Sequence, residues 1–360
     1  MPLLELLCVG LLLASAAQAL AFCPNGCSCD DETLVVTCRD ANLDVIPITL
    51  NPSIQRLDLK NNRIKTVDSA FQFYGELQYV DLANNHLFNI SENAFRGLTR
   101  LRNLGLADNR LGAIPTRQLA VMTRLEELSV GQNEFQTLEA NAFQGLTNLR
   151  RLDVSGASQL EKVEKGALKD NLNLEALTLS SNKRLAQVEE GALTGLPNLR
   201  NLVLRDNAFT TFPESLVAWP ELHKVDLAEN PIQCSCALLW LRELLVRRNA
   251  SHVLCASPVH LKERSLRALS PDELGCAFHD TRQQIIIGAI CGLAVSIVVV
   301  ICFLLYHFRR PVQDMLKDYK WNNRAISRKE HEYQKTFSDD DYIVRAAQQP
   351  ALKPIPVTEL

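Results

Sequence analysis

One short phrase, Leu-x-x-Leu-x-Leu-x-x-Asn-x-Leu, recurs eight times between Ile54 and Ile232 and constrains the fold more than any other feature. Successive copies start 23, 24, 24, 24, 25, 25 and 23 residues apart. A single copy cannot bury its own apolar side chains, whereas stacked copies share one continuous core. The phrase therefore predicts a solenoid with one coil per copy. The copies start at Ile54, Leu77, Leu101, Leu125, Leu149, Leu174, Leu199 and Leu222.

Within each copy, the first, fourth and sixth residues are expected to point inward from a short parallel strand. The ninth residue is asparagine in seven copies, and its amide is expected to be buried and to bond the backbone of adjacent coils. The fifth copy has Ala157 in that place and Leu160 one residue late, which predicts an irregular turn. A second apolar residue in the back half of each copy is expected to fill the core from the convex side. These residues are Phe71, Phe95, Leu119, Phe143, Leu168, Leu193 and Leu216.

The phrase and its period resemble the extracellular leucine-rich repeat family, and the resemblance covers roughly half of the chain. It implies an α/β fold, a leucine-rich repeat solenoid with a parallel β-sheet on its concave face and a disulfide-bonded cap at each end. The expected segments are an N-terminal cap at 22–53, eight repeats at 54–232 and a C-terminal cap at 233–278.

The eleven cysteines gather outside the repeats, with four at 23–38, four at 234–276 and none between the two groups. This distribution indicates disulfide-bonded caps in an oxidising compartment. A zinc site is the alternative at the N-terminal group, and a secreted chain disfavours it. The family resemblance implies the pairs Cys23–Cys29, Cys27–Cys38, Cys234–Cys255 and Cys236–Cys276. Trp240, next to the C-terminal group, is expected to plug the open end of the core.

Two apolar segments predict how the chain meets a membrane. Residues 1–21 have an apolar centre followed by small residues, which is typical of a signal peptide. After an expected stalk at 279–284, residues 285–306 are uncharged and long enough to cross a bilayer as a helix. The basic residues that follow place the tail, 307–360, in the cytoplasm. We therefore expect a single-pass type I protein of the plasma membrane.

Gly288, Gly292 and Ser296 lie four residues apart in the expected membrane helix, on one face. Small residues at this spacing allow two helices to approach closely, which predicts a homodimer through Gly288 and Gly292. The alternative is that glycine is simply common in membrane helices.

The 54-residue tail has too little apolar content to fold a signalling domain, so any signal it sends must involve recruitment. Its last four residues, Val-Thr-Glu-Leu, resemble a class I PDZ ligand, with Thr358 and Leu360 as the recognised side chains and a cytoplasmic PDZ-domain protein as partner. Ser338 and Tyr342 flank an acidic run that suits phosphorylation, whereas the alternative is a solvated charge run.

Two sequons indicate N-glycosylation, at Asn89 and at Asn249. Asn51 is excluded because proline follows it. Glycans at these two positions would cover the surface around them.

No constellation of residues indicates catalysis, a metal or a cofactor, so we predict a protein that is not an enzyme. The seven histidines are scattered, and neither a nucleophile elbow nor a phosphate-binding glycine loop is present. A net charge of −3 gives no indication of nucleic-acid binding.

The concave sheet is the surface expected to bind a protein, because solenoids present an extended curved face. Its central side chains alternate in charge between copies, and we predict a ligand-binding set on this face. The alternative is that these charges neutralise one another between neighbouring strands. The predicted ligand-binding residues are Tyr79, Arg102, Glu126, Glu127, Arg150 and Arg151.

The predicted function is a cell-surface receptor or adhesion protein that binds an extracellular protein and recruits a PDZ scaffold. The order of segments is similar to that of leucine-rich repeat adhesion and synapse-organising proteins. The alternative is an auxiliary subunit of a membrane channel or receptor complex, because the auxiliary gamma subunits of large-conductance potassium channels share the same order. This chain departs from those subunits, because it has eight repeats and they have six.

Overall fold

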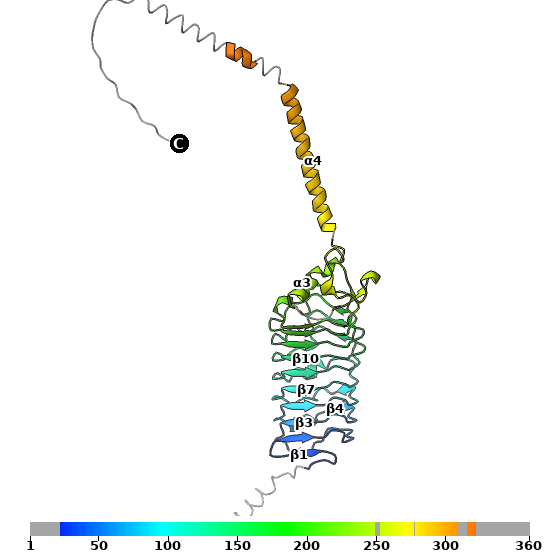
Figure 1. Cartoon of the computed structure of the whole chain (residues 1–360). Coiled ribbons are helices and arrows are strands. Elements are labelled where there is room, and N and C mark those ends of the chain that lie inside the picture. The colour runs from blue at the N-terminus through cyan, green and yellow to red at the C-terminus, as the bar shows by residue number, and fades with distance from the viewer. Residues whose placement is uncertain (1–21, 249–252, 277, 308–314, 322–360) are drawn as a thin grey trace, which may run out of the picture. The chain divides into compact units, whose positions relative to one another are not determined.

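The computed structural model describes residues 22–248, 253–276, 278–307 and 315–321. Contacts between residues divide the chain into two units, 1–277 and 278–360. The first unit is a solenoid with its caps, and the second contains the apolar helix. Figure 1 shows the strands of the solenoid stacked one above another, with β3, β7 and β10 in one stack and β4 across the coil from them.

The main sheet has ten strands, and each of the eight copies of the repeated phrase contributes one of them. β1 and β2, from the N-terminal cap, pair antiparallel, and every later pair is parallel. The order is β1 (Ser28–Asp30), β2 (Val35–Thr37), β3 (Arg56–Asp58), β5 (Tyr79–Asp81), β7 (Asn103–Gly105), β8 (Glu127–Ser129), β10 (Arg151–Asp153), β12 (Ala176–Thr178), β14 (Asn201–Val203) and β15 (Lys224–Asp226). This confirms the predicted parallel solenoid.

Shorter strands form smaller sheets elsewhere in the coils. We call β4, β6, β9, β11 and β13 the rear strands. β4 (Thr66–Val67) pairs with β6 (Asn89–Ile90), and β11 (Lys162–Val163) lies between β9 (Thr137–Leu138) and β13 (Gln187–Val188). In the C-terminal cap, β16 (Ile232–Gln233) pairs with β17 (Cys255–Ser257).

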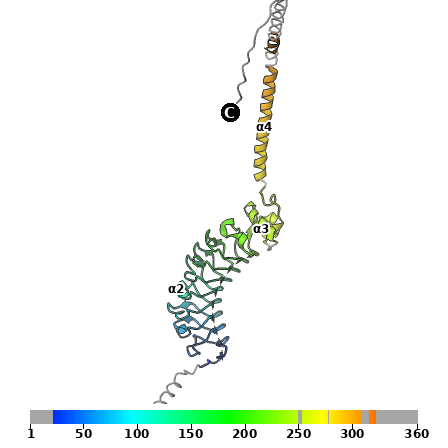
Figure 2. The ribbon, with the colours of Figure 1, turned by 90° about the vertical axis from the view of Figure 1, so that its left-hand side faces the viewer.

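The third repeat contributes no rear strand to the described sheets. Helix α2 (Thr116–Leu119) follows Pro115 there and lies on the convex side in Figure 2. The Gln118 side chain donates a 3.0 Å hydrogen bond to the Ile90 carbonyl at the edge of β6. The 3₁₀ segments are η1 (Ala70–Phe73), η2 (Glu214–Leu216), η3 (Trp219–Glu221), η4 (Cys236–Leu238), η5 (Val259–Leu261) and η6 (Leu266–Ala268).

The core is one continuous cluster that runs through all eight repeats, because the inward leucines of each coil contact those of the next. The second apolar residue of each repeat, predicted to fill the core from the convex side, is also buried. Every asparagine predicted to be buried is at most 7% exposed.

Asn133 shows how these asparagines hold adjacent coils together. Its amide nitrogen donates to the carbonyls of Val130 and Gly131 in its own turn and of Leu106 in the preceding coil, at 2.8–3.0 Å. Its amide oxygen accepts the Leu111 N–H at 3.0 Å. The amide therefore satisfies backbone groups that no strand reaches.

The irregular turn predicted in the fifth repeat is present. Gly156 has φ of +73°, and Leu160 turns back to donate to the Ala157 carbonyl at 3.0 Å. The next asparagine, Asn182, still accepts the Ala157 N–H at 2.8 Å. Its buried amide nitrogen, however, has no hydrogen-bond partner among the described residues. At Asn182 the ladder therefore keeps only the bond that the amide oxygen accepts from the preceding coil.

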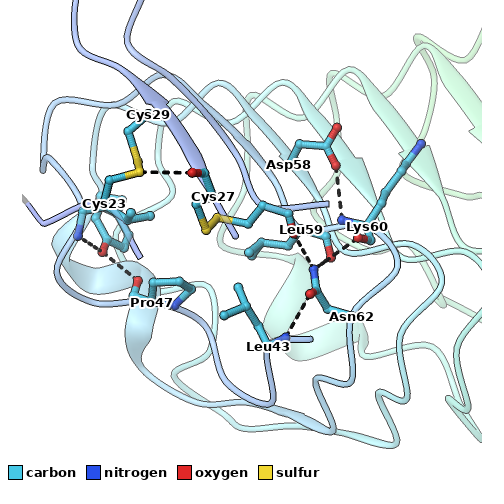
Figure 3. The surroundings of a disulfide bond; sticks show 12 residues. Cys23, Cys27, Cys29, Leu43, Pro47, Asp58, Leu59, Lys60 and Asn62 are labelled. Atoms are coloured by element: carbon cyan, nitrogen blue, oxygen red, sulfur yellow. Dashed lines mark hydrogen bonds between the residues drawn. A yellow bond between two sulfur atoms is a disulfide. The ribbon is translucent and has the colours of Figure 1, made fainter. Parts of the chain in front are cut away.

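The structure has four disulfides, and their pairs are the ones that the family resemblance implies: Cys23–Cys29, Cys27–Cys38, Cys234–Cys255 and Cys236–Cys276. Figure 3 shows the N-terminal cap, where Asn62 donates to the Leu59 and Lys60 carbonyls and accepts the Leu43 N–H. Asn62, the first asparagine of the ladder, lies in the first repeat, and its bonds join that repeat to the cap.

At the other end, the main plug of the core differs from the expected one. Trp240, in α3 (Leu239–Arg248), is only partly buried, whereas Trp219 is 2% exposed. Their ring centroids lie 5.1 Å apart, and the Phe212 ring meets Trp219 on another side. Trp219 is therefore the tryptophan that is buried in the core, which continues past it into the C-terminal cap, and Trp240 covers Trp219.

Helix α4 (Phe278–His307) is a single helix, so the stretch expected as a stalk, 279–284, is its first part. Its segment Ile285–His307 has a mean hydropathy of 3.0 and is long and apolar enough to cross a membrane. The Ser296 hydroxyl bonds the Gly292 carbonyl of the same helix at 2.5 Å. The predicted homodimer through Gly288 and Gly292 stays a prediction.

Candidate functional site

The concave face of the main sheet carries the predicted ligand-binding residues in rows along the stack. Strand pairing aligns equivalent positions of adjacent repeats, so each row holds one side chain per repeat. The edge row, just before the strands, is Gln55, Gln78, Arg102, Glu126, Arg150, Glu175, Arg200 and His223. The first strand row is Arg56, Tyr79, Asn103, Glu127, Arg151, Ala176, Asn201 and Lys224. The second strand row is Asp58, Asp81, Gly105, Ser129, Asp153, Thr178, Val203 and Asp226.

At the N-terminal end of the face, two aspartates of the second strand row are buried against cations. The Asp58 carboxylate forms an ion pair with the Arg39 guanidinium, with an N–O distance of 2.6 Å. The Asp81 carboxylate forms one with the Lys60 ammonium group, at 2.9 Å. Hydrogen bonding and charge from Asp58 raise the pKa of Arg39. Buried carboxylates require such partners. The Asp81 carboxylate lies over Gly105 of the next repeat, where a Cβ atom would meet a carboxylate oxygen at 2.5 Å. Glycine therefore makes room for Asp81.

Tyr79 completes this end of the face. Its hydroxyl donates a 2.8 Å hydrogen bond to Asp81, and the Arg56 guanidinium lies 3.6 Å from its ring centroid. Burial, assisted by the bond to Asp81, raises the pKa of Tyr79 to about 12. Tyr79 is thus held in one orientation by an anion at its hydroxyl and a cation on its ring.

The centre of the face is a set of ion pairs between adjacent repeats. Each charge predicted to bind a ligand here already has an opposite charge beside it. The pairs are Arg102–Glu126, Glu127–Arg151 and Arg150–Glu175. The hydrogen bond that the Arg151 guanidinium donates to Glu127 raises the pKa of Arg151. The structure therefore contains the neutralising pairs that sequence analysis offered as the alternative interpretation.

These pairs remain accessible from solvent, because the six side chains are between 30% and 57% exposed. A protein partner would meet the paired charges directly and would not need to uncover them. Exposed pairs of this kind contribute little to stability, on the order of 0–1 kcal/mol. Neutralisation within the sheet and recognition of a partner are therefore compatible.

A second ladder of asparagines borders the edge row, and sequence analysis missed it. Asn148, Asn173 and Asn198 each precede the first leucine of a repeat and donate to a carbonyl of the preceding coil at 2.7–2.9 Å. With Glu126, Arg150 and Glu175 they line a shallow hollow of about 420 Å³. The signal was present as Asn-Leu at the start of three successive repeats.

The remaining predicted site residues divide into two groups. Asn89 lies exposed in β6, and Gly288 and Gly292 lie in α4. Asn249, Ser338, Tyr342, Thr358 and Leu360 lie outside the described residues. Among the residues that are described, no group of three or more His, Cys, Asp or Glu is placed to hold a metal ion. The arrangement on the concave face is suited to binding by charge and hydrogen bonding.

Comparison with known proteins supports a repeat architecture. The model of the family described as leucine rich repeat matches residues 52–111, 99–160, 156–209 and 172–232, which together span half of the chain. The crystal structure of human 5T4 (Wnt-activated inhibitory factor 1, trophoblast glycoprotein) superposes with a TM-score of 0.60. The superposed part covers 70% of this chain and 99% of the 5T4 chain, at 24% sequence identity, which shows a shared fold.

Similar sequences are also found among well-described proteins. The human chondroadherin-like protein is 42% identical over 27% of this chain. Human reticulon-4 receptor-like 2 and human amphoterin-induced protein 2 are 35% and 34% identical, each over 25% of this chain. The matched parts span only 13%, 21% and 18% of these three relatives. This chain therefore matches only a short part of each of these relatives.

Proposed function

Because the chain belongs to the leucine-rich repeat family, we propose that it is a cell-surface recognition protein that binds an extracellular protein through its concave face. The observation that carries this proposal is the charge pattern at the centre of that face. Arginine and glutamate alternate from one repeat to the next in the edge row, and a second pair, Glu127–Arg151, lies beside them in the first strand row.

A fixed pattern of exposed, paired charges supports selective recognition. The ion pairs hold each side chain in one place, so a partner meets a preorganised surface and loses less conformational freedom on binding. Complementary charges on a partner would then set the register and increase the rate of encounter. Tyr79, with the Arg56 guanidinium on its ring, adds an aromatic and cationic anchor at one end, of the kind that binding hot spots favour.

The test exchanges the two charges of one pair. The double variant Glu127→Arg/Arg151→Glu keeps an ion pair between the same strands and reverses its direction on the surface. Partners of the full chain on living cells are identified by proximity labelling, and their enrichment is compared between the two chains. If the pattern is read by a partner, the variant loses at least tenfold of the enrichment of that partner.

A matched control exists among the rear strands. Lys162 of β11 and Glu189, which directly follows β13, form a 2.5 Å ion pair outside the concave face. The exchange Lys162→Glu/Glu189→Lys is expected to leave partner enrichment unchanged. Equal enrichment for both exchanged variants and the parent chain would refute the role of the central concave charges.

The proposal includes an orientation in the membrane and a second partner. We propose that Ile285–His307 crosses the plasma membrane once, with the solenoid outside and the tail inside, as a single-pass type I protein. The apolar length of this segment and the basic residues after it support this orientation.

The tail is proposed to recruit a PDZ-domain protein through Thr358 and Leu360. A free carboxylate, an apolar last residue and a hydroxyl two positions earlier suit addition to a sheet edge. Removal of residues 358–360 is expected to abolish co-precipitation of a PDZ scaffold, while Glu359→Ala, which keeps both recognised side chains, is expected to preserve it. Retention of the scaffold by the truncated chain would refute this part.

A further inference from the structure

The N-terminal part of the rear surface is unusually apolar for an exposed surface. Val45, Ile48, Phe73 and Phe88 are 70%, 59%, 50% and 60% exposed, and we call these four residues the apolar rear patch. The first three line one groove of about 350 Å³, together with Thr66 of β4. Val45, Ile48 and Phe73, which share the groove, expose on the order of 300 Å² of apolar surface, the size at which a contiguous patch on a soluble protein often has a function.

The rear surface of later repeats is different. Lys162 of β11 forms ion pairs with Glu189 and Glu164, and Arg184 pairs with Glu161 at 3.3 Å. The rear surface therefore carries ion pairs in the later repeats, whereas the N-terminal cap and the segments beside β4 and β6 expose apolar side chains. The apolar part is a local feature that the fold itself does not require.

A glycosylation sequon lies next to the groove. In the β4–β6 pair, Asn89 is aligned with Thr66, which lines the groove, so the two side chains lie on the same face about 5 Å apart. Asn89 is exposed. Phe88 and Asn89 also line a second groove, of about 350 Å³, which the missing rear strand of the third repeat leaves beside β6.

We infer that an N-linked glycan on Asn89 lies over the apolar rear patch and is the ligand of both grooves. Pyranose rings have apolar C–H faces that pack against aromatic and aliphatic side chains, while their hydroxyl groups remain in water. Asn89 shares one groove with Phe88, and Thr66, aligned with Asn89, shares the other groove with Phe73, so both aromatic rings lie beside the attachment site of the glycan. The glycan thus keeps the patch from contacting other proteins, and partner binding is left to the concave face.

This inference depends on the proposed extracellular position of the solenoid, because N-glycans are added only in the secretory pathway. The test uses the full chain, expressed in animal cells and reconstituted in lipid nanodiscs. Occupancy of Asn89 and Asn249 is measured by mass spectrometry of glycopeptides. Hydroxyl-radical footprinting then measures the oxidation rates of Phe73 and Phe88, with Leu172, 52% exposed elsewhere, as the internal reference.

Two substitutions at one position separate the glycan from the side chains. Ser91→Ala removes the sequon and leaves Asn89 in place, whereas Ser91→Thr retains the sequon as the matched control. Ser91→Ala is expected to increase the oxidation of Phe73 and Phe88 at least threefold relative to Leu172, and Ser91→Thr is expected to change neither. Enzymatic removal of glycans from the folded parent chain is expected to give the same increase in oxidation. This second measurement tests the inference even if Ser91→Ala fails to fold.

Three results would overturn the inference. Asn89 found empty while Asn249 carries a glycan would remove the proposed occupant. Asn89 found glycosylated, with equal oxidation rates before and after glycan removal, would show that the sugar lies away from the patch or that another molecule covers it. Both sequons empty would also remove the proposed occupant and overturn the inference. The extracellular position is tested separately, by epitope staining of intact cells, so the two failures are distinguishable.

Discussion

The buried asparagines act as single residues that replace strand hydrogen bonds between coils. Asn133 makes four hydrogen bonds with the backbone, while the amide nitrogen of Asn182 has no partner among the described residues. The two residues occupy the same place in the repeat and are equally enclosed. They therefore form a natural pair for measuring what the hydrogen bonds contribute.

Asn133→Ala is expected to lower the free energy of unfolding by about 3 kcal/mol, since it leaves several buried backbone groups without partners. Asn182→Ala is expected to cost about half as much, because the amide nitrogen it removes donates no bond. Urea unfolding of residues 22–276 provides the measurement. Equal losses for the two variants would contradict the ladder as described.

Tyr79 should titrate unlike an ordinary tyrosine. Its pKa is raised to about 12, from a usual value near 10, so folding favours the neutral phenol. The stability that Tyr79 contributes is present below pH 10 and is lost as the pH rises from 10 to 12. The tyrosinate absorbance of the parent chain minus that of Tyr79→Phe should therefore have a midpoint near 12 in the folded state. A midpoint near 10 would contradict burial against Asp81.

At the scale of elements, the spacing of coils is set where backbones approach closely. Gly131 is buried beside the fifth repeat, and a Cβ atom there would lie 2.1 Å from the Ser155 carbonyl oxygen. That carbonyl is part of the backbone, so it cannot move away as a side chain would. Gly112, in the third repeat, has open space around its Cβ direction.

Gly131→Ala is expected to destabilise the solenoid by about 2–3 kcal/mol, because two repeats must separate to accept the methyl group. Gly112→Ala is expected to change stability by less than about 0.5 kcal/mol. Thermal unfolding of the two variants under identical conditions makes the comparison. A neutral Gly131→Ala would show that the coils are packed less closely than described.

The C-terminal end of the core offers a second comparison between elements. Trp219 is fully enclosed between Phe212 and Trp240, whereas Trp240 is partly exposed. Trp219→Ala is expected to cost about 3–4 kcal/mol, near the usual loss for a buried tryptophan. Trp240→Ala is expected to cost clearly less. The reverse order, measured by urea unfolding, would make Trp240 the plug that its sequence position suggested.

Periodic features of this fold could be read from the sequence, because a solenoid repeats one local environment many times. The inward leucines, the asparagine ladder and the apolar residues of the convex side each recur at a fixed place, so each copy supports the others. The irregular turn at Ala157 was predictable for the same reason, since it departs from a pattern that is otherwise regular.

Other features were missed or left open in the sequence. Trp219 lies three residues before the next copy starts, a place at which Tyr74, Leu98, Met122, Leu146 and Leu196 are also buried, so its burial follows the repeat pattern although it was not predicted. The pairing of Glu127 with Arg151 depends on side-chain rotamers, so the sequence left recognition and neutralisation as alternatives. The third and seventh repeats, which both have no rear strand among the described residues, carry a proline at the same place, Pro115 and Pro213, so this feature also has a signal in the sequence.

At the scale of the whole molecule, three properties support one account. A sealed, disulfide-capped stack needs an oxidising environment, an apolar helix needs a membrane, and exposed paired charges on a concave face suit a protein partner. The solenoid outside the cell and the tail inside satisfy all three together. The orientation of the chain is therefore the claim on which partner binding, glycosylation and PDZ recruitment all depend.

The most direct measurement is antibody staining of cells that express the chain with one epitope after Phe22 and another before the last four residues. The account predicts that the first epitope is stained on intact cells and that the second is stained only after the membrane is made permeable. Staining of the second epitope on intact cells, with the first one hidden, would contradict it.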